Sequence, residues 1–332
     1  MSATPPAGSA SLKLARSNRQ SDSRKRADRV GDITLRLICT AAALLAAVVL
    51  ILIAKEVFEG AQPAFSKYGF SFLTSHEWAP PLEKFGGEGL IFGTLITSAM
   101  ALLIGAPVAI SIAVFLALLA PVGVRNVISP LVEMLAAVPS VILGFWGVLI
   151  LGPVLANNVE PFLHDNFGFI PLFGAPQTTG SSIFNAGLIL TIMVIPIIAS
   201  VSRDLFMAVP RELQDGAAAL GSTRWEVIRG VVLPSTFSGL IAACLLGLGR
   251  ALGEAIAVSQ VIGGATESHI SLFKTGGTLA SIIALQFPSA VSALHTASLY
   301  YCAALLLVIG VTANLLASWV GYRFSNAGAV AR

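Results

Sequence analysis

Hydrophobic positions in this chain gather in long runs that short polar stretches separate. Six runs are long enough to cross a bilayer as α-helix, which takes about 20 apolar residues. They cover residues 34–55, 88–119, 131–155, 182–202, 236–262 and 295–319. A transmembrane barrel would instead show short segments of alternating polarity. The pattern therefore predicts an all-α polytopic membrane protein with about six transmembrane helices.

The composition agrees with this class and narrows the chemistry. Hydrophobic residues make up 55% of the 332 residues, and charged residues only 11%. The cysteines Cys39, Cys244 and Cys302 lie in separate apolar runs, so neither a disulfide framework nor metal-type spacing is predicted. The four histidines are not clustered, and no nucleophile–base set stands out. We expect no catalytic residue, metal or cofactor in this chain.

Positive charge predicts the orientation. With the N-terminus in the cytosol, 15 of the 20 lysine and arginine residues fall in inside segments, and Arg250 lies within a span. Positively charged loops stay on the cytoplasmic side of a membrane. We therefore expect cytoplasmic N- and C-termini, with a first external loop at residues 56–87.

The N-terminal segment differs from the rest of the chain. Residues 1–32 are polar and rich in serine and arginine, which predicts a disordered basic cytoplasmic tail. A solvated tail that helps to set orientation is favoured over an arm that binds lipid or nucleic acid. Residues 33–325 form the transmembrane domain in this interpretation.

The segment at residues 203–234 is cytosolic in this topology, although apolar runs flank it. Pro210 suits the first turn of a helix, and Gly221 suits the end of one. Thr223 and Glu226 have the spacing of a capping box. Trp225, Ile228 and Val232 then fall on one face of a second short helix. Periodicity predicts a helical hairpin here and leaves open whether it merely links two spans.

Small residues in this hairpin match a known pattern. The cytoplasmic coupling loop of ABC-importer permeases reads Glu-Ala-Ala, three residues, Gly, nine residues, Ile, one residue, Leu-Pro. This chain resembles it without a gap, with Asp for Glu, Gly for the first Ala and Val for Ile. The resemblance implies a type I ABC-importer permease fold whose loop at 203–234 docks on a separate ATPase subunit. The coupling residues carried over are Asp215, Ala217, Ala218, Gly221, Trp225, Leu233 and Pro234.

Longer stretches resemble the permeases of the bacterial phosphate importer, the Pst system. They are "VEMLAAVPSVILGFWG" at 132–147, "LTIMVIPIIASVSRDLFMAVP" at 190–210 and "LGRALGEAIAVSQVIGG" at 248–264. The likeness covers residues 65–320, and the external "FLTSHEWAPP" favours the PstC-like permease of the two.

This resemblance implies a transport complex of several different subunits in the bacterial inner membrane. The partners would be a second, PstA-like permease, two PstB-like ATPase subunits, an external PstS-like phosphate-binding protein, inorganic phosphate and membrane lipid, but no nucleic acid. The chain has no G-x-x-x-x-G-K-[ST] motif. ATP and magnesium are therefore expected on the partner ATPase, and this chain is expected to be a non-catalytic subunit.

Three ionisable residues lie within the predicted spans. Arg250 and Glu254 are four residues apart, so one helix would place them on the same face. A guanidinium offers two N–H groups to an oxyanion, so Arg250 is predicted to line a substrate pathway. The alternative that remains open is an internal ion pair between Arg250 and Glu254. Ser140, next to Pro139, is a third pathway candidate. Glu133, near the inner boundary, is predicted to be structural.

Other transporters remain as alternatives to a phosphate importer. A permease for sulfate or molybdate would also use an arginine, and only the Pst-like stretches argue against it. A secondary transporter driven by an ion gradient would need no coupling loop. A membrane assembly protein without transport would not need the charged residues within its spans.

Overall fold

The computed structural model describes residues 8–267 and 269–329, and the side chains from residue 31 to residue 321 apart from residue 268. The chain divides into two units, residues 1–56 and 57–332, and each is considered by itself. Within the described residues there is no β-strand, and two isolated bridges, Ala79 with Lys84 and Gly263 with Gly276, are the only extended pairings. The described part is thus all-α, as the sequence predicts.

The first unit consists of the beginning of helix α1 (Gly8–Tyr68). Its apolar side chains from Ile33 to Ile53 are exposed. The helix also includes residues 8–32, for which composition predicts a disordered tail, and no proline or glycine between residues 9 and 30 interrupts it. Residues 1–7 of the predicted tail lie outside the described residues.

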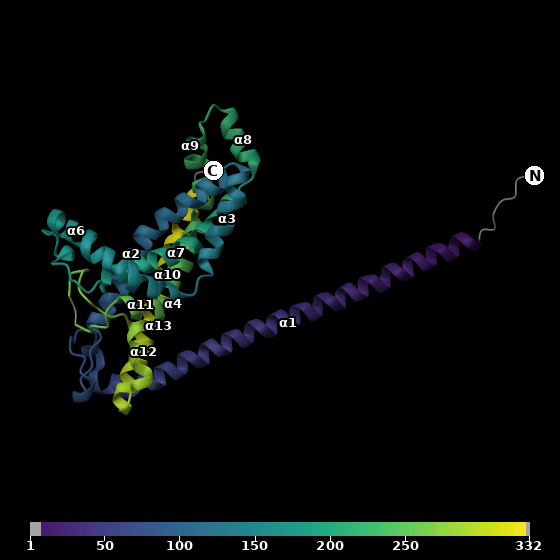
Figure 1. Ribbon diagram of the computed structural model, residues 1–332. Coiled ribbons are helices and arrows are strands. Elements are labelled where there is room, and N and C mark those ends of the chain that lie inside the picture. The colour runs from purple at the N-terminus through teal and green to yellow at the C-terminus, as the bar shows by residue number, and fades with distance from the viewer. Residues whose placement is uncertain (1–7, 268, 330–332) are drawn as a thin grey trace, which may run out of the picture. The chain divides into compact units, whose positions relative to one another are not determined.

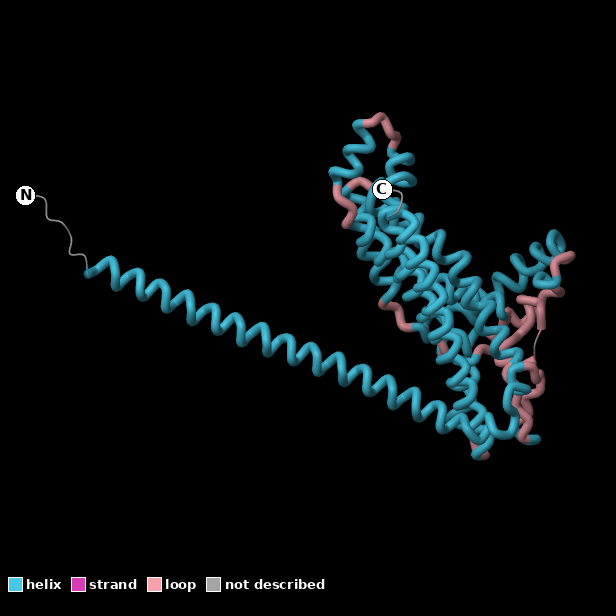
Figure 2. Tube along the Cα trace, turned by 180° about the vertical axis from the view of Figure 1, so that it is seen from behind, coloured by secondary structure: helices cyan, strands magenta, loops and turns pink. Residues whose placement is uncertain are grey.

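The second unit is a helical bundle (Figures 1 and 2). Its helices alternate with shorter 3₁₀ and π-helical turns, labelled η. The α-helices are α2 (Glu88–Val114), α3 (Val122–Ala136), α4 (Ser140–Trp146), α5 (Gly152–Val154), α6 (Glu160–Phe167), α7 (Ile183–Met207), α8 (Arg211–Ala219), α9 (Arg224–Val227), α10 (Leu233–Gly253), α11 (Ile256–Val261), α12 (Leu279–Gln286) and α13 (Ala293–Ala329). The η turns are η1 (Gly69–Leu73), η2 (Pro80–Leu82), η3 (Phe115–Leu119), η4 (Gly147–Leu151), η5 (Leu155–Val159), η6 (Pro171–Phe173), η7 (Ile228–Val232) and η8 (Phe287–Ser289).

Within the described residues, six helical segments are long and apolar enough to span a membrane, which confirms the predicted number. They are Gly31–Leu73, Glu88–Leu119, Ser140–Phe167, Ile183–Met207, Arg224–Gly253 and Ala293–Gly321. The third begins at Ser140, not at residue 131, because Pro139 adopts an extended conformation and separates α3 from α4. A proline and its predecessor both disfavour helical continuation.

Helix α7 forms the centre of the second unit, with α2, α3 and α10 packed around it. Its apolar side chains are buried around most of its circumference, as expected of a helix without a polar face. The largest buried cluster is therefore built on Ile189, Leu190, Val194 and Ile198.

The segment between α1 and α2 is ordered by packing on α12 and α13. The Trp78 indole N–H donates to Oε1 of Gln286 at 2.9 Å, and the Phe72 ring stacks on Tyr301 with centroids 4.4 Å apart. Helix α1 continues to Tyr68, so the first part of the predicted external loop 56–87 is helical. The rest of that segment forms a fixed cap on the bundle.

Helix α2 approaches the chain before α12 without room for a side chain. A Cβ at Gly93 would overlap the backbone carbonyl of Gly277. At the next residue, the Thr94 hydroxyl accepts a hydrogen bond from the Leu279 N–H at 2.9 Å and donates to the Leu90 carbonyl at 2.7 Å. Glycine at position 93 is therefore required for this junction.

We expect Gly93→Ala to lower the free energy of unfolding by about 1–3 kcal/mol, because backbone must move to admit the methyl group. The matched control is Gly123→Ala in α3, where a Cβ meets nothing within 4 Å. It should leave stability unchanged or raise it by about 0.5–1 kcal/mol. The measurement is thermal unfolding of the purified chain in detergent, and equal midpoints for the two variants would contradict this account.

Candidate functional site

Helices α8 and α9 form a hairpin that projects from one end of the second unit, away from α12 (Figure 1). Helix α8 begins directly after Pro210 and ends at Ala219. Gly221 has φ +91°, and its N–H donates to the Ala218 carbonyl at 3.0 Å. This left-handed conformation favours glycine and ends the helix, which confirms the predicted role of Gly221 in the backbone.

The predicted capping box at the start of α9 is present. The Thr223 N–H donates to Oε2 of Glu226 at 2.7 Å, and the Glu226 N–H donates to Oγ1 of Thr223 at 3.4 Å. These two bonds satisfy N–H groups that have no partner within the helix. The turn between α8 and α9 is thus held by Gly221 at the end of α8 and by the capping box at the start of α9.

One detail of the hairpin differs from the prediction. Ile228 and Val232 are buried, but Trp225, expected on the same face, is 63% exposed. Helix α9 has only four residues and passes directly into the π-helical turn η7, so the expected period of 3.6 residues does not hold. The indole is consequently available on the outer surface of the hairpin.

The residues of the small-residue pattern fall into two places. Asp215, Ala218 and Gly221 are exposed on the hairpin, and Ala217 is half-buried. Leu233 and Pro234 lie at the first turn of α10, where the Leu233 side chain packs against a buried cluster. The first group therefore forms surface, while the second group starts the fifth span.

A hollow of about 350 Å³ lies between the hairpin and the end of the second span. Asp215, Ala218 and Arg224 line it from the hairpin, and Leu118 and Leu119 line it from η3. The hairpin surface is therefore concave on one side.

Leu220 is a surface residue that the sequence analysis did not single out. It is 90% exposed at the tip of the hairpin, beside Gly221. Leu220 thus adds a large apolar side chain to a tip that otherwise consists of small residues. The sequence signal for Leu220 was its position between three alanines and Gly221 in a segment outside the predicted spans.

Among the ion pairs of the described residues, none joins Arg250 to Glu254. Helix α10 ends at Gly253, and Glu254 at its C-cap has ψ 111°, so the chain leaves the helix directly after Glu254. Oε1 of Glu254 instead accepts from the Ala257 N–H at 3.2 Å, which caps the start of α11. The i, i+4 argument presumes an unbroken helix, and here the helix does not extend beyond Gly253.

Arg250 itself is exposed on the surface of α10. It borders an open hollow of about 590 Å³, whose other lining residues are Ile197, Ala242, Leu245, Leu246, Gly249 and Asn314. A charged side chain within a span avoids lipid and faces a protein partner or an aqueous cavity. This face of α10 therefore requires a polar environment that the single chain does not supply.

Ser140 is half-buried at the first residue of α4. Helix α4 packs against α11, since a Cβ at Gly144 would lie 3.0 Å from the Ala257 backbone and one at Gly147 would overlap Val261. This register makes the two helices parallel. Ser140, the first residue of α4, and Glu254, two residues before α11, consequently lie at the same end of this pair.

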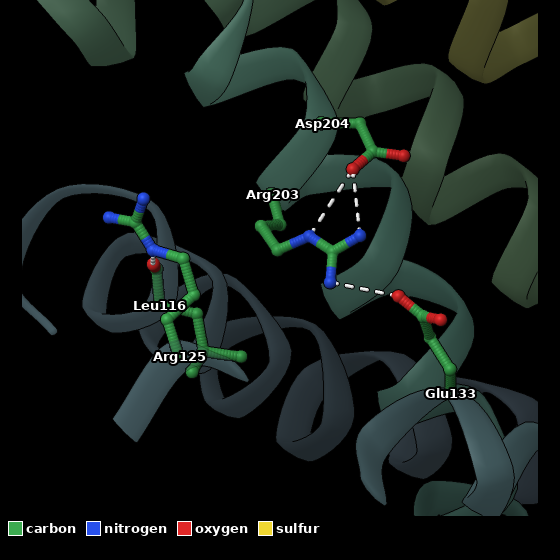
Figure 3. A network of polar contacts seen from close by, with 5 residues as sticks. All are labelled: Leu116, Arg125, Glu133, Arg203 and Asp204. Carbon is green, nitrogen blue, oxygen red and sulfur yellow. Dashed lines mark hydrogen bonds and ion pairs between the residues drawn. The ribbon is translucent and has the colours of Figure 1, made fainter. Parts of the chain in front are cut away.

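An ion-pair network joins α3 to α7 (Figure 3). Nη1 of Arg203 lies 2.9 Å from Oε1 of Glu133, and Nη2 lies 3.0 Å from Oδ1 of Asp204. Nearby, the Arg125 guanidinium donates to the carbonyls of Leu116 and Ala117 at 2.7 Å each. Glu133 thus has a partner on a neighbouring helix, in keeping with the structural role that was predicted for it.

No group of three or more His, Cys, Asp or Glu side chains that could hold a metal ion occurs within residues 31–267 and 269–321. The chemistry of the described part therefore consists of an exposed hairpin, broken spans and isolated intramembrane charges.

The chain is similar to known transport proteins. The model of the family "Binding-protein-dependent transport system inner membrane component" matches residues 109–326. Phosphate transport system permease protein PstC of Mesorhizobium japonicum is 42% identical over 302 residues, 90% of this chain and 91% of that protein. PstC of Pasteurella multocida is 47% identical over 236 residues, 70% of this chain and 73% of that protein. The chain belongs to this family, among its PstC permeases.

The fold agrees with that of a solved importer. A chain of the bacterial alginate ABC transporter, crystallised with an alginate-bound periplasmic protein, superposes with a TM-score of 0.56 at 20% identity. The match covers 87% of this chain and 97% of that chain. The protein is thus a multi-pass inner membrane permease with the type I ABC-importer fold.

Proposed function

We propose that this permease is the transmembrane subunit of an ATP-driven phosphate importer. The observation that carries the proposal is the exposed hairpin with the coupling-loop pattern, in a chain whose relatives from several bacteria are phosphate transport permeases. An importer for sulfate or molybdate is less favoured, because the relatives named above are phosphate transport permeases. A secondary transporter would have no use for the hairpin.

The hairpin is the proposed attachment to the ATPase. Asp215, Ala218, Gly221 and Trp225 are exposed there, and Leu220 and Trp225 offer apolar contact area. Small residues let a partner chain approach the α8 backbone closely. ATP and magnesium would be bound by that ATPase, and this chain would contribute movement rather than catalysis.

The pathway is proposed to run past Arg250, Ser140 and Glu254 at an interface with a second, PstA-like permease. Arg250 is exposed within a span, and the first turns of α4 and α11 lie at the same end. Helix starts carry partial positive charge and favour anions, and broken helices of transporters use them in this way. An external PstS-like protein would deliver phosphate from the opposite side to the hairpin.

Arg250→Lys should reduce ATP-driven phosphate uptake about 10-fold or more, because an ammonium cannot reproduce a two-pronged hydrogen bond to phosphate. Arg36→Lys, the same change at an exposed arginine of α1, should leave uptake near the wild-type rate. Both are measured with the complete importer in proteoliposomes. Uptake by Arg250→Lys at the wild-type rate would remove Arg250 from the pathway.

Leu220→Glu should abolish coupling, since it places charge where apolar contact with the ATPase is proposed. Leu220→Met keeps an apolar side chain at the same position and should retain most uptake. Membrane insertion should be normal for both variants, because this side chain is 90% exposed. The measurements are copurification of the ATPase and phosphate-dependent ATP hydrolysis, and full coupling in Leu220→Glu would argue against the docking surface.

The proposed orientation has the hairpin in the cytoplasm. In a background where Cys39, Cys244 and Cys302 are replaced, Asp165→Cys should react with an impermeant thiol reagent added to intact cells. Ala219→Cys should react only after the membrane is opened. Both positions are exposed, so accessibility reports the side of the membrane. Labelling of Ala219→Cys in sealed cells would reverse the topology.

A further inference from the structure

A buried carboxyl group lies where α6 meets the start of α7. Glu160, the first residue of α6, is 1% exposed. The Ser182 hydroxyl, at the N-cap of α7, donates to Oε1 of Glu160 at 3.1 Å and accepts from the Asn185 N–H at 3.1 Å. Glu160 and Asn185 therefore belong to one hydrogen-bond network that Ser182 joins.

Two oxygens of this network have no hydrogen-bond donor. They are Oε2 of Glu160 and Oδ1 of Asn185, and both are buried. The orientation of the Asn185 amide is fixed, since its Nδ2 donates to the carbonyls of Gly147 at 3.1 Å and Gly180 at 2.9 Å. A flipped amide would set Oδ1 against these two acceptors. Unsatisfied buried acceptors are rare and often mark an ion or water.

An ionised carboxyl at this depth requires a positive charge. Within the described residues, neither lysine, arginine nor histidine forms an ion pair with Glu160. His164, one turn further along α6, uses its Nδ1 on the carbonyl of Phe173 at 3.0 Å. The backbone N–H of Gln177 also faces the carboxyl group, but it carries no full charge. The ionised form therefore takes its counter-charge from outside the chain, whereas a protonated carboxyl group needs none.

The oxygen atoms around Glu160 and Asn185 determine which kind of cation could bind there. The available ligands are carboxylate, amide and hydroxyl oxygens, together with the second lone pairs of the Gly147 and Gly180 carbonyls, and oxygen ligands suit hard cations. One carboxylate balances one positive charge. Glycine at 152 and 180 brings the backbone close, because a Cβ at Gly152 would lie 2.8 Å from the Gly180 oxygen. A small monovalent cation fits this set better than a divalent metal.

We propose that Glu160, Ser182 and Asn185 form a buried binding site for a small monovalent cation of the sodium class. The ion neutralises Glu160 and joins α6 to the start of α7, the central helix. The site is separate from the proposed phosphate pathway and does not depend on that function.

The test measures thermal unfolding of the purified importer in NaCl against N-methylglucamine chloride at constant chloride concentration and pH 8. Sodium at 100 times its dissociation constant should raise the midpoint by about 5 °C, saturably. Glu160→Gln keeps the side-chain shape without the charge and should lose this shift. Asp165→Asn, an exposed carboxylate of the same helix, should retain it.

Binding of radioactive sodium to the wild-type importer provides a second readout that does not rely on a variant that folds. Saturation at one ion per chain, competed by unlabelled NaCl, is the expected result. Absence of both saturable binding and a sodium-specific shift would overturn the site. An equal shift in Glu160→Gln would place the ion elsewhere. Stabilisation of the wild type at pH 6 with no sodium effect at pH 8 would mean that a proton neutralises Glu160.

Discussion

The need to satisfy backbone hydrogen bonds without water governs this structure. Inside a bilayer every N–H and C=O group must find its partner within protein, and helices achieve this locally. The chain departs from helix within its apolar runs at Pro139 and between Gly253 and Ala255. Both departures adjoin the packed pair α4 and α11, where Glu254 supplies an acceptor for an N–H of α11. Broken helices are thus placed where neighbouring protein replaces the lost bonds.

These breaks also decide where charge is tolerated. Arg250 lies three residues before the end of α10, Glu254 follows directly after that end, and no ion pair joins the two. Neither neutralises the other, which leaves the guanidinium available to a ligand. Because the exposed face around Arg250 cannot face hydrocarbon, the proposed second permease and the anion pathway account for it together.

Local rules predicted the parts of the molecule that local interactions build. Apolar run length gave the six spans, and glycine conformation and capping-box spacing gave the α8–α9 hairpin. Nothing local distinguishes Gly253, where α10 ends, from Gly249, through which it continues. No local pattern singled out Glu160 either, yet it is buried and bonded to Ser182, 22 residues later. Tertiary packing decided these positions, and a sequence pattern cannot report it.

A displacement of the α8–α9 hairpin can move the spans only if the hairpin is rigidly attached to them. Val232 and Leu240 pack in one buried cluster with Ala117 of the second span and Phe206 of α7, so the base of the hairpin is continuous with three spans. Arg203 joins α7 to α3 through Glu133 in the same region. A force on exposed Leu220 therefore reaches α2, α7 and α10 together through close-packed side chains, which resist compression. The helices are interrupted beside Ser140 and Glu254. A movement at these interruptions would alter the surroundings of Arg250.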